Sequence, residues 1–139
     1  MSFTVIEKNG NHVVTPTLTK TFLTNQLIID LDSNFMNIAV PKNHCSYFHE
    51  ADSICQQMNT NVQHKNSIKQ ETNTLNVKIM HRNNKYIVKT SHIDTIPVTI
   101  YDIKNYSDFK ITVRCNLLNI NDANESALLW HIKDITFLR

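Results

Sequence analysis

The clearest pattern along the chain is an alternation of apolar and polar residues between positions 108 and 120. Every second residue from Phe109 to Leu117 is apolar, while Lys110 and Arg114 occupy polar positions between them. Because successive side chains of a strand point to opposite faces, this period of two predicts a β-strand. We expect one face of the strand to be buried and the other to be polar and basic.

Shorter runs rich in branched and aromatic residues predict further strands. These runs are Phe3–Ile6, Leu27–Leu31, Phe35–Val40, Ile96–Ile103 and Ala127–Leu138. The polar residues 32–34 predict a turn that joins the second and third runs into a hairpin. In the last run the alternation breaks near His131–Asp134, which predicts a β-bulge.

One segment, residues 43–58, has the apolar spacing of an α-helix. Its apolar residues recur every three or four positions and form one stripe, made of Tyr47, Ala51, Ile54, Cys55 and Met58. Asn43 or Ser46 is suited to cap the helix N-terminus. The next residues, 59–73, are mostly polar and predict a long exposed loop.

The order of these elements favours a mainly β fold in a single domain, residues 1–139. Strands and helices do not alternate, so a parallel α/β sheet is not expected. Short strands joined by turns, with one helix in the middle, are typical of a small antiparallel barrel of the OB type with about five to seven strands. A β-sandwich is the alternative.

Charge changes this picture locally, because the net charge of +2 conceals a basic segment. Residues 64–92 contain six lysines and arginines but only one acid, Glu71. The second half of this segment predicts a hairpin that turns at Asn83-Asn84 and pairs Arg82 with Lys85 and Lys78 with Lys89. Like charges placed opposite each other destabilise a hairpin, which indicates a surface that meets a polyanion. A solvated face that deters aggregation is the alternative.

Composition excludes several classes of protein. Gly10 is the only glycine, so neither a Walker A loop nor a dinucleotide-binding glycine motif is present. The three cysteines are irregularly spaced, which is typical of a reducing compartment rather than a disulfide framework. The first residues lack the layout of a signal peptide, and no apolar run is long enough for a membrane span. We therefore expect an intracellular location and no membrane partner.

Metal binding has weak support. His44, Cys45, His49 and Cys55 offer atoms that zinc binds, but their spacing matches no zinc-finger pattern. Cys55 also falls on the apolar stripe of the expected helix. We expect buried thiols and surface histidines instead of a metal site.

Catalysis has equally weak support. Asp30 and Asp32 share one strand face, and Asp102 with Lys104 resembles a short part of a carboxylate–lysine nuclease pattern. Such strings are common, and acidic residues near turns usually serve the turn itself. No serine or cysteine lies in a nucleophile elbow. We therefore expect no enzymatic activity, with a metal-dependent nuclease as the reading to be tested if that expectation fails.

The C-terminal third, from Ile96 to Arg139, carries a resemblance to a known family. An Ile-Pro step precedes a strand, a basic alternating strand follows, and the last strand ends in the apolar run from Trp130 to Leu138. This arrangement resembles the closing strands of OB-fold single-stranded DNA-binding proteins of phages and large DNA viruses. The resemblance implies an OB-like barrel and a role in viral or phage DNA replication or recombination. The chain departs from that family in having no glycines at these turns and no acidic C-terminal tail.

Together these observations predict a protein that binds single-stranded DNA, or RNA, with little sequence preference and without a cofactor. Basic side chains would hold phosphates, and exposed tyrosines would stack on bases. The residues expected to do so are Lys78, Arg82, Lys85, Lys89, Lys110, Arg114, Tyr101 and Tyr106. The alternative is a β-rich structural or protein-interaction protein that self-associates as a homo-oligomer, which the near-neutral total charge favours.

Overall fold

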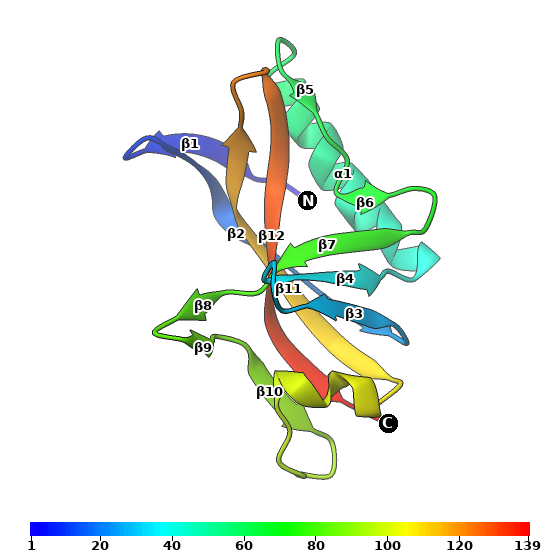
Figure 1. The fold of residues 1–139 in the computed structure, drawn as a ribbon. Coiled ribbons are helices and arrows are strands. Elements are labelled where there is room, and N and C mark those ends of the chain that lie inside the picture. The colour runs from blue at the N-terminus through cyan, green and yellow to red at the C-terminus, as the bar shows by residue number, and fades with distance from the viewer.

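The structure is a computed structural model that describes residues 1–139, and it is mainly β (Figure 1). Its first elements are β1 (Thr4–Lys8), β2 (Asn11–Thr24), β3 (Leu27–Asp30), β4 (Phe35–Ala39), α1 (Lys42–Met58), β5 (Gln63–His64) and β6 (Ile68–Lys69). The others are β7 (Thr74–Lys78), β8 (His81–Arg82), β9 (Lys85–Tyr86), β10 (Lys89–His92), the 3₁₀ helix η1 (Ile100–Asn105), β11 (Phe109–Ile120) and β12 (Glu125–Phe137).

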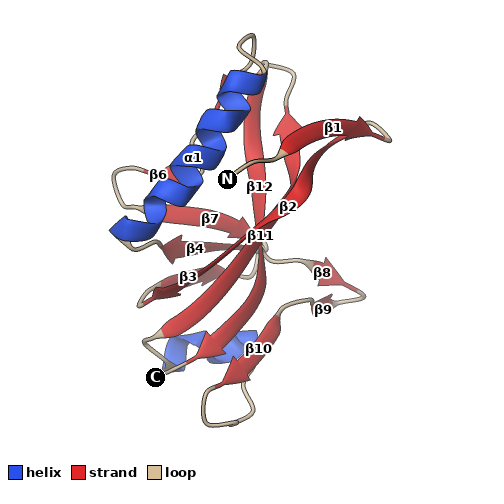
Figure 2. Cartoon of the chain, turned by 180° about the vertical axis from the view of Figure 1, so that it is seen from behind, coloured by secondary structure: helices blue, strands red, loops and turns tan.

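Ten strands form one mixed sheet, in which seven follow the order β1-β2-β11-β12-β7-β4-β3 and three lie off this path: β5 and β10 pair with β12, and β6 pairs with β7. The long strands β2, β11 and β12 are antiparallel, whereas β5, β7 and β10 each pair in parallel with a different part of β12. Figures 1 and 2 both show β7, β4 and β3 crossing the direction of the long strands on the side where α1 lies. No helix of the protein has the length and apolar character needed to cross a membrane.

The expected closed barrel is not seen, because β1 and β3 lie at opposite ends of the strand order and do not pair. The reason lies in β12, whose second edge is shared among three short segments instead of one long strand. β7 meets β12 at a single residue pair, so the sheet turns there rather than closing. The sheet is therefore open, and it is also mixed rather than antiparallel.

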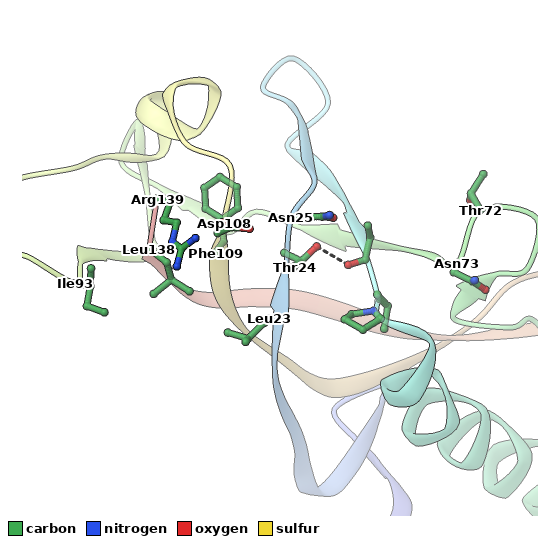
Figure 3. A pocket seen from close by; sticks show the side chains of 13 residues that line it. Leu23, Thr24, Asn25, Thr72, Asn73, Ile93, Asp108, Phe109, Leu138 and Arg139 are labelled. Atoms are coloured by element: carbon green, nitrogen blue, oxygen red, sulfur yellow. Dashed lines mark hydrogen bonds between the residues drawn. The ribbon is translucent and has the colours of Figure 1, made fainter.

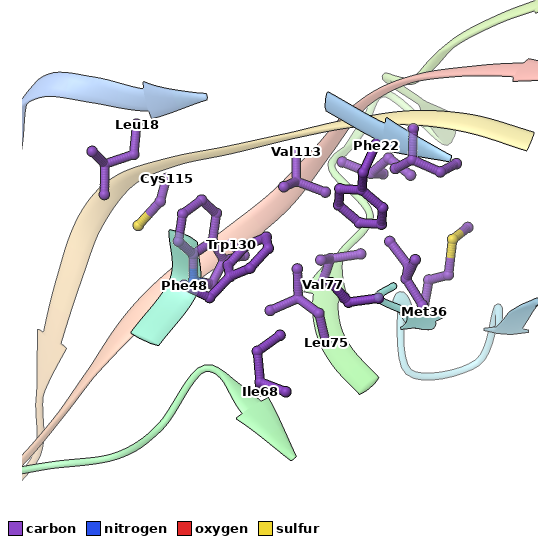
Figure 4. Close-up of a cluster of buried hydrophobic side chains, with 14 of the residues drawn as sticks. Leu18, Phe22, Met36, Phe48, Ile68, Leu75, Val77, Val113, Cys115 and Trp130 are labelled. Carbon is purple, nitrogen blue, oxygen red and sulfur yellow. The ribbon is translucent and has the colours of Figure 1, made fainter. Parts of the chain in front are cut away.

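The hydrophobic core lies between α1 and the inner face of the sheet (Figure 4). Phe48 of α1 and Trp130 of β12 pack edge to face, with 4.9 Å between ring centroids. Leu75 and Val77 of β7 are fully buried in the same cluster. Truncating a buried aromatic such as Phe48 to alanine costs about 3–5 kcal/mol in typical cores, so these rings anchor the helix to the sheet.

The alternating segment forms β11 as predicted. Ile111, Val113 and Cys115 are fully buried, while Lys110 is exposed and Arg114 is half-buried on the other face. The bulge predicted in the last strand is also confirmed. Thr112 pairs with Asp134 and Val113 pairs with Ile132, which leaves Lys133 as the extra residue of β12.

The helix is confirmed at Lys42–Met58, but its expected cap is wrong. Pro41 occupies the N-cap position and no side chain caps the helix, so neither Asn43 nor Ser46 has that role. Proline is suited to the start of a helix because its missing N–H has no partner there in any case. Met58, the last residue of the predicted apolar stripe, is exposed.

Two further expectations need correction. Residues 59–73 are not a plain exposed loop, because they contain β5 and β6 and bury Val62 and Ile68. Residues 96–103 are not a strand, because the chain turns into η1. Thr99 and Asp102 form a capping box there, in which the Asp102 carboxylate accepts a hydrogen bond of 2.7 Å from the Thr99 backbone N–H. Reciprocal capping of this kind favours a helical turn over an extended segment.

Candidate functional site

The basic hairpin exists, in a shorter form than predicted. β8 and β9 form a separate two-stranded sheet in which Arg82 lies opposite Lys85. Asn83 and Asn84 have φ angles of 52° and 63°, as a tight turn between two such strands requires. Figures 1 and 2 show this hairpin projecting from the side of the sheet opposite α1.

The expected pairing of Lys78 with Lys89 is wrong. The last hydrogen bond between the two arms of the hairpin runs from the Ile87 N–H to the Met80 carbonyl oxygen, at 2.8 Å. Beyond it, away from the turn, the two arms separate. Lys78 then pairs with His131 of β12, and Lys89 pairs with Asp134 of the same strand. Pairing with β12 satisfies the backbone groups along the second edge of a long central strand, which a lone hairpin cannot do.

Three basic side chains lie side by side across the sheet. Arg114 of β11 pairs with His131, and His131 pairs with Lys78 on its other side. Residues paired in this way have side chains on the same face, so the row presents Arg114, His131 and Lys78 together. This face is the one directed away from the core, since the neighbouring Val113 and Ile132 are buried on the inner face.

A groove of about 490 Å³ lies where this row meets the hairpin. We call it the basic groove, and its lining residues are Met80, Arg82, Tyr86, Ile87, Val88, Lys89, Arg114, His131, Ile132 and Lys133. Its polar side chains are two arginines, two lysines, one histidine and one tyrosine. No acidic residue lines it. Three expected site residues, Arg82, Lys89 and Arg114, therefore meet in one place.

The floor of the basic groove has unusual electrostatics. The Nε atom of Arg114 is buried and has no hydrogen-bond partner. Burial and the nearby charge of Arg114 lower the pKa of His131, which favours the neutral imidazole near pH 7. A buried donor without an acceptor costs free energy, so the site is suited to a ligand that brings one.

Two more lysines extend the same face beyond the groove. Lys110 shares a face of β11 with Arg114 and stands about 13 Å from it, given a rise of about 3.3 Å per residue. Lys78 flanks the groove from β7, next to His131. Asp134 is an acid on this face, and it lies opposite Lys89.

Lys85 and Tyr101 lie beside the groove rather than in it. They line a second hollow of about 290 Å³ together with Tyr86, and Tyr86 also lines the basic groove. The rings of Tyr86 and Tyr101 are 6.2 Å apart between centroids. Tyr101 is 60% exposed, which leaves most of its ring available to a ligand.

Tyr106 is placed elsewhere. Its ring packs edge to face on Phe137, with 5.0 Å between centroids, and lies 5.3 Å from the ring of His92. It is half-buried and lines neither hollow. The structure therefore gives it a packing role next to η1 and does not bring it to the other site residues.

Sequence reasoning missed His131 and Lys133 as site residues, although both lie in the basic groove. The available signal was the broken alternation of the last strand, because the bulge makes Lys133 an extra residue at this point. Met80 and Ile87, which the sequence places between the basic residues of the predicted hairpin, also line the groove and are 41% and 47% exposed. They place aliphatic surface beside the cations.

A buried polar network ties α1 to the sheet. The Asp52 Oδ1 and Ser126 Oγ atoms each lie 2.8 Å from a ring nitrogen of His64, and Asp52 also accepts hydrogen bonds from the backbone and hydroxyl of Ser67. Trp130 donates to the Ser67 hydroxyl at 2.9 Å. The order serine–histidine–aspartate occurs in hydrolases, but here the side chains of Asp52 and His64 are only 5% and 2% exposed. We interpret the network as a structural tie.

A hollow of about 820 Å³, larger than the basic groove, lies at the C-terminal end of β12 (Figure 3). Asp108, Phe109, Leu138 and Arg139 form one part of its wall, and Thr72 and Asn73 lie at the far side. Asp108 and Arg139 are its only charged residues, and none of the expected site residues lines it. The hollow offers mixed polarity without a convergent set of reactive groups.

No three side chains of the types that bind metal come together in the structure. Cys45 and Cys55 are buried, and burial raises the pKa of Cys55 to about 12, which keeps its thiol protonated. Asp30 accepts hydrogen bonds from the backbone N–H groups of Asp32 and Ser33 in a turn. With Asp102 in its capping box, these acids have local structural roles.

Comparison with known proteins adds nothing to this geometry. No family model, no curated protein and no solved structure matches the chain. The function is therefore argued from the arrangement of its own side chains.

Proposed function

We propose that the protein binds single-stranded nucleic acid, DNA in the first place, through the basic groove and with little sequence preference. The observation that carries the proposal is the meeting of Arg82, Lys89, Arg114, His131 and Lys133 in one groove without an acidic residue. These residues come from four different strands, so the fold gathers four cations and a histidine that are distant in the sequence.

The phosphate backbone supplies the main attraction in this proposal. Cations in the groove release counterions from the strand, and this contribution does not depend on base sequence. Lys110 and Lys78 lie on the same sheet face outside the groove and extend the basic track along and across the sheet.

Bases would contact the hairpin side of the groove. Tyr86 lines both hollows, Tyr101 is exposed beside Lys85, and Met80 and Ile87 provide aliphatic surface. Stacking on an aromatic ring is worth about 1–3 kcal/mol per base and tolerates every base. The combination favours binding without strong sequence preference.

A charge-reversal experiment tests the proposal. In Lys78→Glu with Lys89→Glu, both replaced residues lie at the basic groove or beside it. Lys8→Glu with Lys42→Glu makes the same change of net charge at exposed residues that do not line the groove. We expect the first pair to weaken binding of labelled oligo-dT at least about tenfold in fluorescence anisotropy, which corresponds to about 1.4 kcal/mol, and the second pair to change it little.

Equal effects of the two pairs would show that only net charge matters, and the proposed groove would then be wrong. Parallel titrations with oligo-rU compare RNA with DNA. Equal or tighter binding of the RNA would contradict the preference for DNA.

A second candidate function, self-association through the sheet edge, has an observation of its own. β3 is a terminal strand whose outer edge has no partner. Ile28 on this strand and Phe35 on β4 are 57% and 40% exposed. Exposed edges with apolar side chains are suited to strand addition. Light scattering with Ile28→Lys tests this candidate, since a stable oligomer that dissociates in the variant would support it.

A further inference from the structure

Arg114 has a buried hydrogen-bond donor without an acceptor. Its backbone lies in the middle of β11, between Thr19 of β2 and His131 of β12. Its Nε atom is buried without an acceptor, although the side chain reaches the basic groove. Guanidinium groups bind phosphate oxygens through several N–H donors at once, which is the interaction missing at this position.

His131 stands next to Arg114 on the same face and lines the same groove. Its ring is half-buried, and Lys78 lies on its other side in the sheet. An uncharged imidazole is the less costly form between two permanent cations. A phosphate oxygen placed there would reverse this preference, because the imidazolium could then donate a hydrogen bond to an anion.

We propose that Arg114 and His131 form a phosphate subsite in the floor of the basic groove, and that a proton is taken up there when phosphate binds. This inference rests on the proposed function for its place along a nucleic acid strand, but the subsite itself requires only a phosphate group. It names the chemistry that the groove recognises and the condition that regulates its affinity.

The direction of the pH effect follows from the two states of the histidine. Burial and Arg114 lower the pKa of His131 in the free protein. A bound phosphate raises that pKa, so affinity increases as pH falls from 7.5 towards 5.5. A rise of one pKa unit on binding gives at most about a tenfold gain in affinity.

Other groups around His131 must be considered in the same pH range. The surrounding strands contribute Arg82, Tyr86, Lys89 and Lys78. Lys133 and Asp134 follow on β12 itself, and Asp134 lies opposite Lys89. The β8–β9 hairpin contains one histidine, His81, whose ring centroid lies 4.9 Å from that of Tyr86. His81→Gln is therefore the matched control for His131→Gln.

The test measures oligo-dT affinity at pH 7.5 and 5.5 in constant salt. We expect at least about threefold tighter binding at the lower pH in the wild type and in His81→Gln, within the limit of about tenfold for one pKa unit. His131→Gln should lose this gain, because glutamine has no proton to take up; the readout is the ratio of the affinities at the two pH values in each protein, whatever the affinity of the variant at pH 7.5. An unchanged pH dependence in His131→Gln would overturn the proposal.

A second measurement separates the subsite from the proposed function. NMR titration of the His131 imidazole, with inorganic phosphate or 5′-phosphorylated and 5′-hydroxyl oligo-dT, reports its pKa directly. A rise with inorganic phosphate supports the subsite even if no oligonucleotide binds, in which case the proposed function fails alone. A rise only with oligonucleotides assigns the site to a phosphate of the strand, and the two oligonucleotides distinguish a terminal from an internal phosphate. No rise with any ligand would overturn the subsite.

Discussion

At the scale of single residues, a few buried polar groups define how the helix meets the sheet. Asp52 is 4% exposed and accepts hydrogen bonds from Ser67 and, through Oδ1, contacts His64. Trp130 completes the network through the Ser67 hydroxyl. A buried carboxylate is costly unless its oxygens are satisfied, so the network is stable only while all partners are present.

Removing the carboxylate should therefore destabilise the fold. We expect Asp52→Ala to lower the free energy of unfolding by about 3–5 kcal/mol, because it leaves His64 and Ser67 without their common acceptor. The adjacent Ser53→Ala, at an exposed helix position, should stay within about 0.5 kcal/mol of the wild type. Urea denaturation followed by circular dichroism measures both.

If Asp52→Ala does not fold, Ser67→Ala tests the same network with a smaller expected loss of stability. It removes the acceptor of the Trp130 Nε1–H and should cost about 1–3 kcal/mol. A loss below about 0.5 kcal/mol, as at ordinary surface positions, would show that the network is not a structural tie.

At the scale of elements, the sequence predicted those whose pattern is local. β11, the bulge of β12, the β3–β4 hairpin and α1 follow from periodicity within one segment. β2 was missed because threonines, Pro16 and Lys20 separate Val14, Leu18 and Phe22, so its apolar residues do not alternate strictly. β5 and β10 form by pairing in parallel with β12, and the local sequence of a strand does not identify a parallel partner that is distant in the chain.

The site was predictable to the same extent. Arg82 and Lys85 are neighbours through a local turn, and their pairing was correctly expected. Arg114 comes next to His131 and Lys78 only because β11, β12 and β7 are adjacent in the sheet. That adjacency is a property of the topology: the broken alternation of the last strand marks the bulge at Lys133, but no local pattern places His131 and Lys133 beside Arg114 and the hairpin.

The β8–β9 hairpin allows an element to be tested by itself. Asn84 has a φ of 63°, which a β-branched residue adopts only with strain of about 1–2 kcal/mol. We expect Asn84→Val to weaken oligo-dT binding several-fold, since the hairpin supplies Arg82 and Tyr86 to the basic groove. The melting temperature should fall only slightly, because residues 81–85 are exposed and only Tyr86 of the hairpin packs against the core cluster.

Asn84→Gly is the matched control, because glycine adopts a positive φ readily. It should bind like the wild type. Unchanged affinity in Asn84→Val, with the hairpin shown by NMR to be disordered, would mean that this wall of the groove takes no part in binding.

At the scale of the whole molecule, an open mixed sheet separates two surfaces. The inner face is covered by α1 and η1, which contribute residues to the core cluster. The outer face carries the row of Arg114, His131 and Lys78. The β8–β9 hairpin projects from the side of the sheet opposite α1 (Figure 2). Closure into a barrel would pair the two terminal strands, which here remain free for other contacts. The basic groove gathers Arg82, Lys89, Arg114 and Lys133 without an acidic residue in its lining, so we expect a polyanion to bind there.

The salt dependence of oligo-dT binding tests this central claim most directly. Four phosphate contacts in the basic groove predict that the logarithm of the association constant falls with the logarithm of salt concentration with a slope of about −3. Charge reversal at Lys78 and Lys89 should reduce the steepness of that slope by about one or more, whereas reversal at Lys8 and Lys42 should leave it unchanged. A wild-type slope near zero, or the same slope in all three proteins, would contradict the account.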